Sequence, residues 1–369
     1  MAAPLAPPIP VTVVTGFLGA GKTTLIRHLI EAAGGLRLAL VVNEFGDLGV
    51  DGETLRGCGL PACADEDIVE LSNGCLCCTV AEDFVPTLEA LLARPAPPDH
   101  IVVETSGLAL PQPLLRAFAW PALRGRVTVD GVVAVVDAPA YAAGRFAHDP
   151  EAVERQRRAD DGLDHDTPLA ELFEDQMAAA DLVVVNKADL LGERGAEALA
   201  ERLGRAARPG VAVLPAREGR LPLAVLLGRG MAAEDDPARA ALHHDDHDDH
   251  DEGDHEDHED DHDHDDHGHD AFESFVLERG PVADPAAFAR RLGGAMRDHG
   301  ILRAKGFARV PGRPMRLALQ AVGPRVDHRF DRPWREGDPE GLRLVVIGRR
   351  GLDREAVAAA LAEGEAAAA

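Results

Sequence analysis

Residues 16–23 of the sequence have the spacing of a phosphate-binding loop. They read Gly-Phe-Leu-Gly-Ala-Gly-Lys-Thr and match G-x-x-x-x-G-K-[ST] in full, between an apolar run and an amphipathic helical pattern. Glycines let backbone N–H groups surround phosphate oxygens, while the lysine reaches the β- and γ-phosphates and the threonine hydroxyl binds Mg²⁺. The predicted nucleotide contacts of this loop are Gly16, Gly19, Ala20, Gly21, Lys22, Thr23 and Thr24.

A second motif bears on which base the nucleotide carries. Asn186-Lys187-Ala188-Asp189 follows the apolar run Leu182–Val185, and an N-K-x-D run resembles the guanine-specificity motif of GTPases. The Asp189 carboxylate can accept hydrogen bonds from guanine N1–H and the 2-amino group, which adenine cannot supply, so discrimination is steep. Asn186, Lys187 and Asp189 are therefore predicted to bind GTP.

Two carboxylates follow apolar runs and are candidates for Mg²⁺ and catalysis. Glu104 ends the run His100–Glu104, and Gly107 comes three residues later. We predict that Glu104 holds Mg²⁺ with Thr23 and that the Gly107 amide contacts the γ-phosphate. Glu44 suits a switch segment in which it ligates Mg²⁺ or positions water. Together with Lys22, the two glutamates form the predicted catalytic set. The alternative for Glu104 is a solvated carboxylate at a strand end, and the alternative for the segment at Glu44 is a plain turn.

All five cysteines lie between residues 58 and 78. In an extended chain Cys75 and Cys77 point to one side and Cys78 points to the other. The two thiolates on the same side can therefore share a metal, with other ligands or the nucleotide supplying the rest. Thiolates select soft or borderline metals such as Co²⁺ or Zn²⁺ over Mg²⁺. A redox pair and core cysteines are the alternatives. For Cys58 and Cys63 a metal-relay role and an inert role stay equally open.

A low-complexity tract dominates the charge of the chain. The formal net charge is −26, and residues 243–270 contain 16 of the acidic residues, ten histidines and two glycines. This balance argues against non-specific nucleic-acid or anionic-membrane binding. We expect the tract to be a disordered linker that buffers metal weakly, with a solvated polyacidic spacer as the alternative. Its auxiliary metal ligands would be His243, His244, His247, His250, His255, His258, His262, His264, His267 and His269.

The elements that must position these residues alternate apolar β-branched runs with helical patterns. This alternation predicts an α/β fold with a mostly parallel sheet and flanking helices, followed by a smaller C-terminal α+β domain. The expected boundaries are a nucleotide domain at 1–230, a linker at 231–270, the second domain at 271–362 and a disordered tail at 363–369. The predicted strands are Val11–Thr15, Leu38–Val42, His100–Glu104, Gly131–Asp137, Leu182–Asn186, Val211–Leu214, Phe272–Glu278, Ile301–Val310, Met315–Val322 and Leu342–Ile347.

The prediction for localisation is cytoplasmic. An odd number of clustered cysteines indicates reduced thiols rather than a disulfide framework. The uncharged residues 1–21 lack a basic region and contain four prolines that prevent a helical signal peptide. No stretch qualifies as a transmembrane helix.

The order of these motifs resembles the CobW family of metal-handling GTPases, over nearly the whole chain apart from the linker and tail. Asn43–Gly52, Gly57–Cys63, Ile68–Pro86 and Ile301–Trp334 are most similar to members of cobalamin biosynthesis. Leu76, where Ile is usual, is a conservative departure. The resemblance implies a GTPase that loads Co²⁺ and supports its delivery to the cobaltochelatase.

Three alternatives to that function are considered. A zinc chaperone of the same family would use the same residues. A passive metal store would rely on the His/Asp tract, but the intact phosphate loop argues against it. A nickel-insertion GTPase also often carries a His-rich stretch, yet such proteins usually lack the C-terminal domain and the Cys75–Cys78 run.

Overall fold

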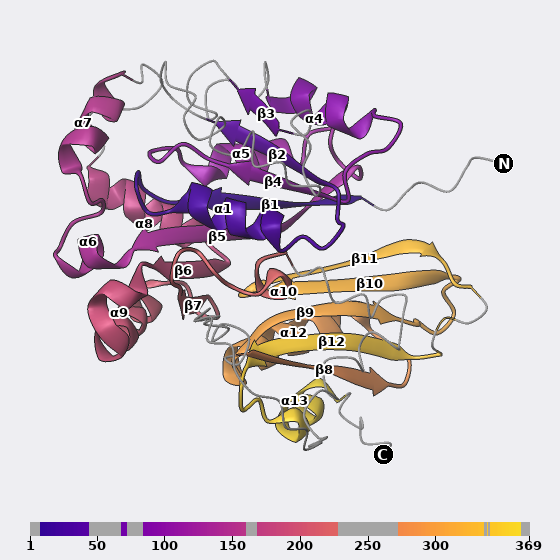
Figure 1. The fold of residues 1–369 in the computed structure, drawn as a ribbon. Coiled ribbons are helices and arrows are strands. Elements are labelled where there is room, and N and C mark those ends of the chain that lie inside the picture. The colour runs from indigo at the N-terminus through magenta and orange to yellow at the C-terminus, as the bar shows by residue number, and fades with distance from the viewer. Residues whose placement is uncertain are drawn as a thin grey trace, which may run out of the picture.

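The structure, a computed structural model, describes residues 8–43, 68–71, 84–159, 168–227, 272–335, 338 and 340–362. The first part of the chain forms a seven-stranded parallel sheet with the order β3-β2-β4-β1-β5-β6-β7 (Figure 1). Its strands are β1 (Ile9–Thr15), β2 (Leu38–Asn43), β3 (Ile68–Leu71), β4 (His100–Glu104), β5 (Val127–Asp137), β6 (Leu182–Asn186) and β7 (Ala212–Pro215).

Helices cover both faces of this sheet, because its central strands are apolar on both sides. Side chains of α1 and α10 pack on one face, and those of α4, α5, α8 and α9 pack on the other. The helices are α1 (Lys22–Glu31), α4 (Val85–Leu92), α5 (Pro111–Ala117), α6 (Ala138–Ala142), α7 (Pro150–Ala159), α8 (Leu169–Ala179), α9 (Gly192–Ala206) and α10 (Leu223–Leu227), with the 3-10 helix η3 (Ala188–Leu191).

The C-terminal part is an antiparallel five-stranded sheet with the order β11-β10-β9-β12-β8. Side chains of two helices pack with the strands in one apolar core. Both helices begin at an aspartate, Asp284 or Asp353, whose carboxylate accepts backbone N–H bonds of the first turn. The elements are β8 (Phe272–Arg279), α12 (Pro285–Asp298), β9 (Ile301–Ala308), β10 (Met315–Val322), β11 (Arg325–Pro333), β12 (Leu342–Arg349) and α13 (Arg354–Leu361).

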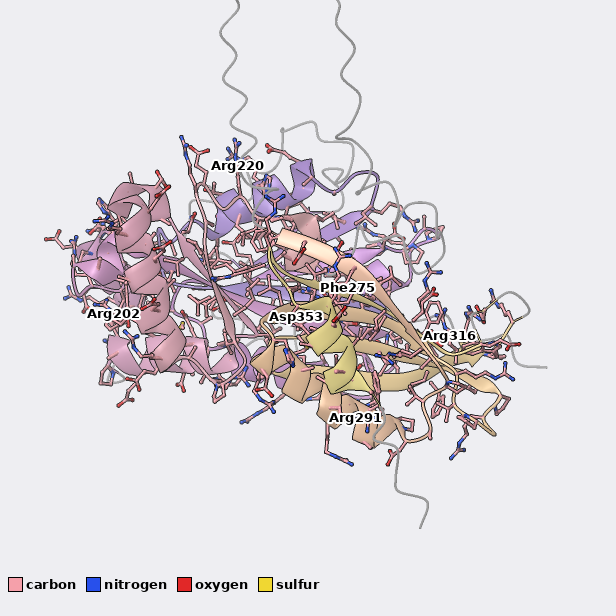
Figure 2. The ribbon with its side chains drawn as sticks, turned by 90° about the horizontal axis from the view of Figure 1, so that it is seen from below. Arg202, Arg220, Phe275, Arg291, Arg316 and Asp353 are labelled. Carbon is pink, nitrogen blue, oxygen red and sulfur yellow. The ribbon has the colours of Figure 1, made fainter. Side chains whose placement is uncertain are left out.

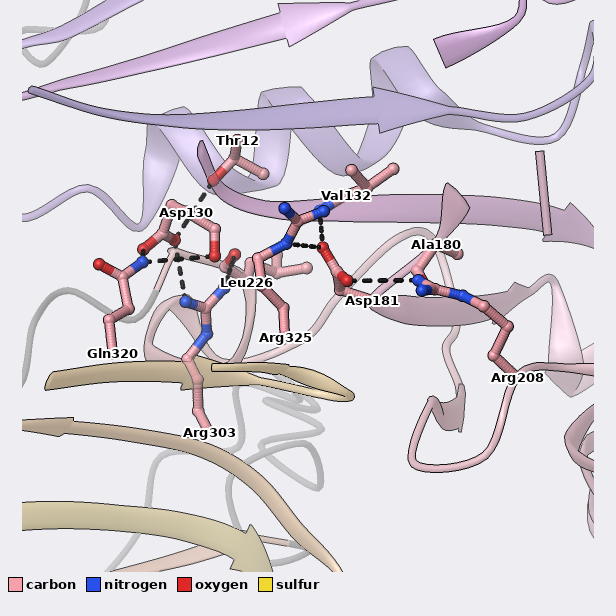
Figure 3. Close-up of polar contacts among 10 residues, drawn as sticks. All are labelled: Thr12, Asp130, Val132, Ala180, Asp181, Arg208, Leu226, Arg303, Gln320 and Arg325. Carbon is pink, nitrogen blue, oxygen red and sulfur yellow. Dashed lines mark hydrogen bonds and ion pairs between the residues drawn. The ribbon is translucent and has the colours of Figure 1, made fainter. Parts of the chain in front are cut away.

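The two sheets meet at a bulge in β5. The register between β1 and β5 skips Asp130, whose side chain is fully buried. Asp130 accepts a hydrogen bond from Arg303 of β9 at 2.9 Å and another from Gln320 of β10 (Figure 3). Nearby, Asp181 pairs with Arg325 of β11 at 2.8 Å. Buried charged groups of the parallel sheet therefore anchor the C-terminal sheet.

The predicted fold class is confirmed: a parallel sheet with flanking helices precedes a smaller domain built on an antiparallel sheet. The predicted strands at 100–104, 182–186 and 315–322 have the observed bounds. Seven of the described elements were not predicted: β3, α5, α6, α7, η3, α10 and β11. In β11, charged side chains alternate along the strand and no apolar run marks it.

Among the helices that the structure describes, none combines the length and the apolar character needed to cross a bilayer.

Candidate nucleotide-binding site

The phosphate-binding loop connects β1 to α1, and its close approach to neighbouring strands requires glycine at two positions. Gly16 and Gly21 have φ values of 138° and 96°. A Cβ atom on Gly16 would lie 2.2 Å from the Val135 carbonyl oxygen, and one on Gly21 would lie 2.2 Å from Asn186 Nδ2. Both positions therefore combine a left-handed backbone with contacts that exclude any side chain.

Lys22 opens α1 and is only 8% exposed. Within the described part of the chain its ammonium has no carboxylate partner. A largely buried cation is favourable only where an anion, from the protein or from a ligand, lies beside it. Lys22 at the N-terminus of a helix therefore fits the phosphates of a nucleotide.

The predicted Mg²⁺ ligands Thr23 and Glu104, which come from a helix and from a strand end, lie together. Glu104 ends β4 and is 2% exposed, and Thr23 lies in the first turn of α1. Thr23 Oγ1 donates a hydrogen bond to Glu104 Oε1 at 3.3 Å. A hydroxyl and a carboxylate are the hard oxygen ligands that suit Mg²⁺, so this pair of residues fits the ion.

Gly107 lies against the phosphate-binding loop, as the prediction of a γ-phosphate contact requires. A Cβ atom on Gly107 would lie 2.8 Å from the Leu18 nitrogen. The side chain of Gln176, on α8, fixes this turn by donating to the Gly107 carbonyl at 3.0 Å.

Asn186 ties the predicted base-binding motif to the phosphate loop. Its Nδ2 donates to the Ala20 carbonyl at 2.9 Å, and its Oδ1 accepts from the Gly219 nitrogen at 2.8 Å. The side chain is 2% exposed. Both ends of the amide are therefore used in holding three loops together.

Lys187 makes a second link, while Asp189 stays accessible. The Lys187 ammonium donates to the Gly19 carbonyl at 2.7 Å and to Asp137 Oδ2 at 2.7 Å. Lys187 itself has a left-handed backbone, with φ of 58°, just before η3. Asp189 is exposed in η3, where a carboxylate is free to accept from a purine base.

Sequence analysis did not single out Asp137, Gln176 or Gly219. Asp137 is the last residue of β5, as Glu104 is the last of β4, and an acid ending a second buried strand was the available signal. Gly219 carried no local signal, since only its distance to Asn186 reveals its place in the site.

Several predicted residues lie outside the described residues. They are Glu44, the metal ligands Cys75, Cys77 and Cys78, the cysteines Cys58 and Cys63, and the ten histidines of the 243–270 tract. Within the ranges that the structure does describe, no group of three or more His, Cys, Asp or Glu side chains could hold a metal ion.

Comparison with known proteins adds to this geometry. The family model for the CobW/HypB/UreG nucleotide-binding domain matches residues 10–215, and the model for the CobW C-terminal domain matches residues 272–365. A "Zinc chaperone CobW" from Sinorhizobium sp is 53% identical, with 96% of each chain covered. This chain belongs to the CobW family.

A second family member, "Zinc chaperone CobW" from Pseudomonas aeruginosa, is 50% identical over 95% of this chain and 90% of that protein. Among solved structures, the Zn(II)-bound YjiA GTPase from E. coli is 25% identical, covers 96% of this chain and 98% of that chain, and gives a TM-score of 0.37. Membership of the CobW family confirms the expectation of a P-loop GTPase that handles a metal ion.

Proposed function

We propose that this CobW-family GTPase is a chaperone for zinc, in which bound GTP controls a thiolate metal site. The observation that carries the nucleotide part is the Asn186 side chain, which joins the base-binding motif to the phosphate loop through Ala20 at 2.9 Å. This contact couples recognition of the base to placement of the phosphates, as a GTP site needs.

The roles proposed for the described residues follow from their contacts. Lys22 would compensate the charge on the β- and γ-phosphates, and Asp189 would accept from guanine. Mg²⁺, held by Thr23 and Glu104, would neutralise charge that develops on the phosphates. Glu104 is buried and accepts a hydrogen bond from Thr23, so its carboxylate is held in a fixed position. Glu44 is proposed as a further ligand or water-positioning group.

The proposal also identifies the metal as zinc rather than cobalt. Cys75, Cys77 and Cys78 would supply thiolates, which bind Zn²⁺ and Co²⁺ alike and bind Zn²⁺ more tightly at most sites. Relatives that are 53% and 50% identical carry the name zinc chaperone, which supports zinc, the alternative considered from the sequence. The cobalt interpretation, with cobaltochelatase as acceptor, has the resemblance alone as its support.

Coupling of the metal to the nucleotide is what makes this a chaperone rather than a store. If GTP raises metal affinity, linkage requires metal to raise GTP affinity by the same factor. The cysteines lie in sequence between β2 and β4, the strands that lead to Glu44 and Glu104. Hydrolysis would weaken the metal site and permit transfer.

The test is a metal competition in the two nucleotide states. Zn²⁺ and Co²⁺ affinities are measured on the full chain with Mg–GTP and with Mg–GDP, using Cys75→Ser/Cys77→Ser as the control. We expect tighter Zn²⁺ than Co²⁺ binding and a roughly 5- to 150-fold increase with GTP over GDP. The control should lose the tight metal site and still bind GTP. Equal metal affinity in the two nucleotide states would refute the proposal. Tighter binding of Co²⁺ than of Zn²⁺ would show that the metal carried is cobalt.

A further inference from the structure

We propose that Asp137 is a positioning residue that holds Lys187 across the nucleotide site and thereby sets the affinity for guanine nucleotides. This inference rests on the proposed function, since it assumes that Gly19 and Lys187 contact a nucleotide. It assigns a role to an acidic side chain outside the phosphate loop, the Mg²⁺ pair and the base-recognition motif.

The geometry of Asp137 leaves its two carboxylate oxygens with separate tasks. The side chain is 1% exposed at the end of β5. Oδ1 accepts from the Ala140 nitrogen at 2.9 Å and caps α6. Oδ2 accepts from the Lys187 ammonium at 2.7 Å. The cap fixes the plane of the carboxyl group, so Oδ2 is held in one place, facing Lys187.

Lys187 needs such a partner because two features of its position are unfavourable. Its φ of 58° lies in the left-handed region, which non-glycine residues rarely adopt. Its long side chain must also lose rotamer freedom to reach the Gly19 carbonyl at 2.7 Å. The ion pair with Asp137 offsets both costs. In the pairing of β5 with β6, Asp137 lies beside Asn186, and this brings the Asp137 carboxylate close to the ammonium of the next residue, Lys187.

The consequence is an effect on binding rather than on chemistry. The Lys187 ammonium donates to the Gly19 carbonyl, in the middle of the loop that would surround the phosphates, and Lys187 is not a member of the Thr23–Glu104 pair proposed for Mg²⁺. A displaced Lys187 side chain would weaken the binding of GTP and of GDP alike. Uniform loss of ground-state and transition-state binding raises KM and leaves kcat unchanged.

The decisive experiment is a double-mutant cycle on the full chain with Asp137→Asn and Lys187→Met. Asparagine keeps the oxygen that caps α6 and removes the charge that faces Lys187. We expect Asp137→Asn to raise both the KM for GTP and the Kd for GDP about tenfold, with kcat changed less than about twofold. In the Lys187→Met background, Asp137→Asn should change either constant less than about twofold, because its target is already gone.

Two further variants control for a general effect of removing a helix-capping charge and for failure of Asp137→Asn to fold. Asp353→Asn is the matched control, because Asp353 also caps a helix, α13, through a 2.9 Å bond to Ala356 and lies in the C-terminal domain (Figure 2). It should leave KM and Kd unchanged. Asp137→Ser, which keeps a helix-capping hydroxyl but no charge, should repeat the effect of Asp137→Asn should the latter fail to fold.

The outcomes separate this inference from the proposed function. Equal tenfold losses with and without Lys187 would show that Asp137 acts independently of Lys187, and an unchanged KM in Asp137→Asn would overturn the role altogether. Absence of GTP binding by the unaltered chain would instead refute the nucleotide site, and an unchanged base preference in Asp189→Asn would refute the assignment of base recognition to Asn186–Asp189.

Discussion

Strand β5 carries two buried aspartates at 130 and 137, and each is paired with a cation from a distant part of the chain. Asp130, at the bulge, meets Arg303, and the two side chains are 0% and 2% exposed. Asp137, at the carboxyl end, meets Lys187, whose side chain is 33% exposed. The same strand therefore holds one closed ion pair and one open ion pair.

The closed pair is surrounded by protein groups that satisfy the remaining hydrogen bonds. Arg303 Nε donates to the Val225 carbonyl at 3.1 Å, and its Nη2 donates to the Leu226 carbonyl at 2.8 Å. Asp130 also accepts from Thr12 of β1 at 3.5 Å (Figure 3). Every contact is internal, so this pair joins α10 and β9 to the parallel sheet.

The open pair differs because it lies at the carboxyl end, where loops replace packed strands. In open α/β sheets this end is where ligands bind. Lys187 touches protein on one side and keeps a third of its side chain accessible on the other. The comparison teaches that a buried acid serves architecture at the middle of a strand and ligand positioning at its end.

The largest expected effect comes from breaking the closed pair. Arg303→Met leaves Asp130 buried without its cation, which should lower the free energy of unfolding by about 3–5 kcal/mol. Urea unfolding measures the change. The double variant Asp130→Asn/Arg303→Met should be more stable than Arg303→Met alone, because no uncompensated charge remains. A loss below about 1 kcal/mol in Arg303→Met would show that the pair does not join the sheets.

Asp137→Asn should destabilise the chain less, by about 1 kcal/mol, since the cap on α6 survives and water can solvate Lys187. The same unfolding experiment makes the comparison direct. Should Asp137→Asn cost as much as Arg303→Met, the distinction between the two ends of β5 would be wrong.

Salt sharpens the contrast further. Screening acts on exposed charges and much less on buried ones. Raising the ionic strength to about 1 M should shrink the destabilisation by Asp137→Asn and leave that of Arg303→Met nearly unchanged. Equal sensitivity of the two variants to salt would contradict the closed character of the Asp130–Arg303 pair.

The two regions also differ in how far the sequence could predict them. The loop at 16–23 and the run at 186–189 are local motifs that follow buried strands, so their place at the sheet edge follows from strand direction. The pairings of Asp130 and Asp137 join residues 173 and 50 positions apart, and no local pattern encodes such distances. Sequence spacing identifies loops, whereas tertiary packing decides which buried acid faces which cation.

Individual elements follow the same rule. The runs at 100–104 and 182–186 were predicted with their observed bounds because every residue in them is buried. The pattern at 150–159 was missed because α7 presents charged residues around most of its surface, with Val153 as a buried residue. The bulge at Asp130 was missed because a strand's alternation does not reveal an inserted residue.

A third carboxylate, Asp338 in the C-terminal domain, provides a reference for the smallest effect. Its two oxygens accept from the Arg332 guanidinium at 2.7 and 2.6 Å. The hydrogen bond from Arg332 is the main cause that lowers the pKa of Asp338 below its ordinary value of 3.8. The pair lies near the surface, with side chains 21% and 12% exposed. Arg316, which is labelled in Figure 2, lies on β10 and lowers the pKa of Asp338 further through a weaker charge–charge attraction.

Because the folded-state pKa of Asp338 is lowered, its contribution to stability is complete above the unfolded value of 3.8 and declines as pH falls through the folded value. Asp338→Asn should therefore cost up to about 1 kcal/mol at pH 7, as surface pairs do. The difference between the variant and the unaltered chain should disappear as the pH falls well below 3.8. Urea unfolding at pH 7, 4 and 2 measures it. A difference that persists at the lowest pH would show that the carboxylate charge is not what stabilises this turn, and that shape or packing at Asp338 is.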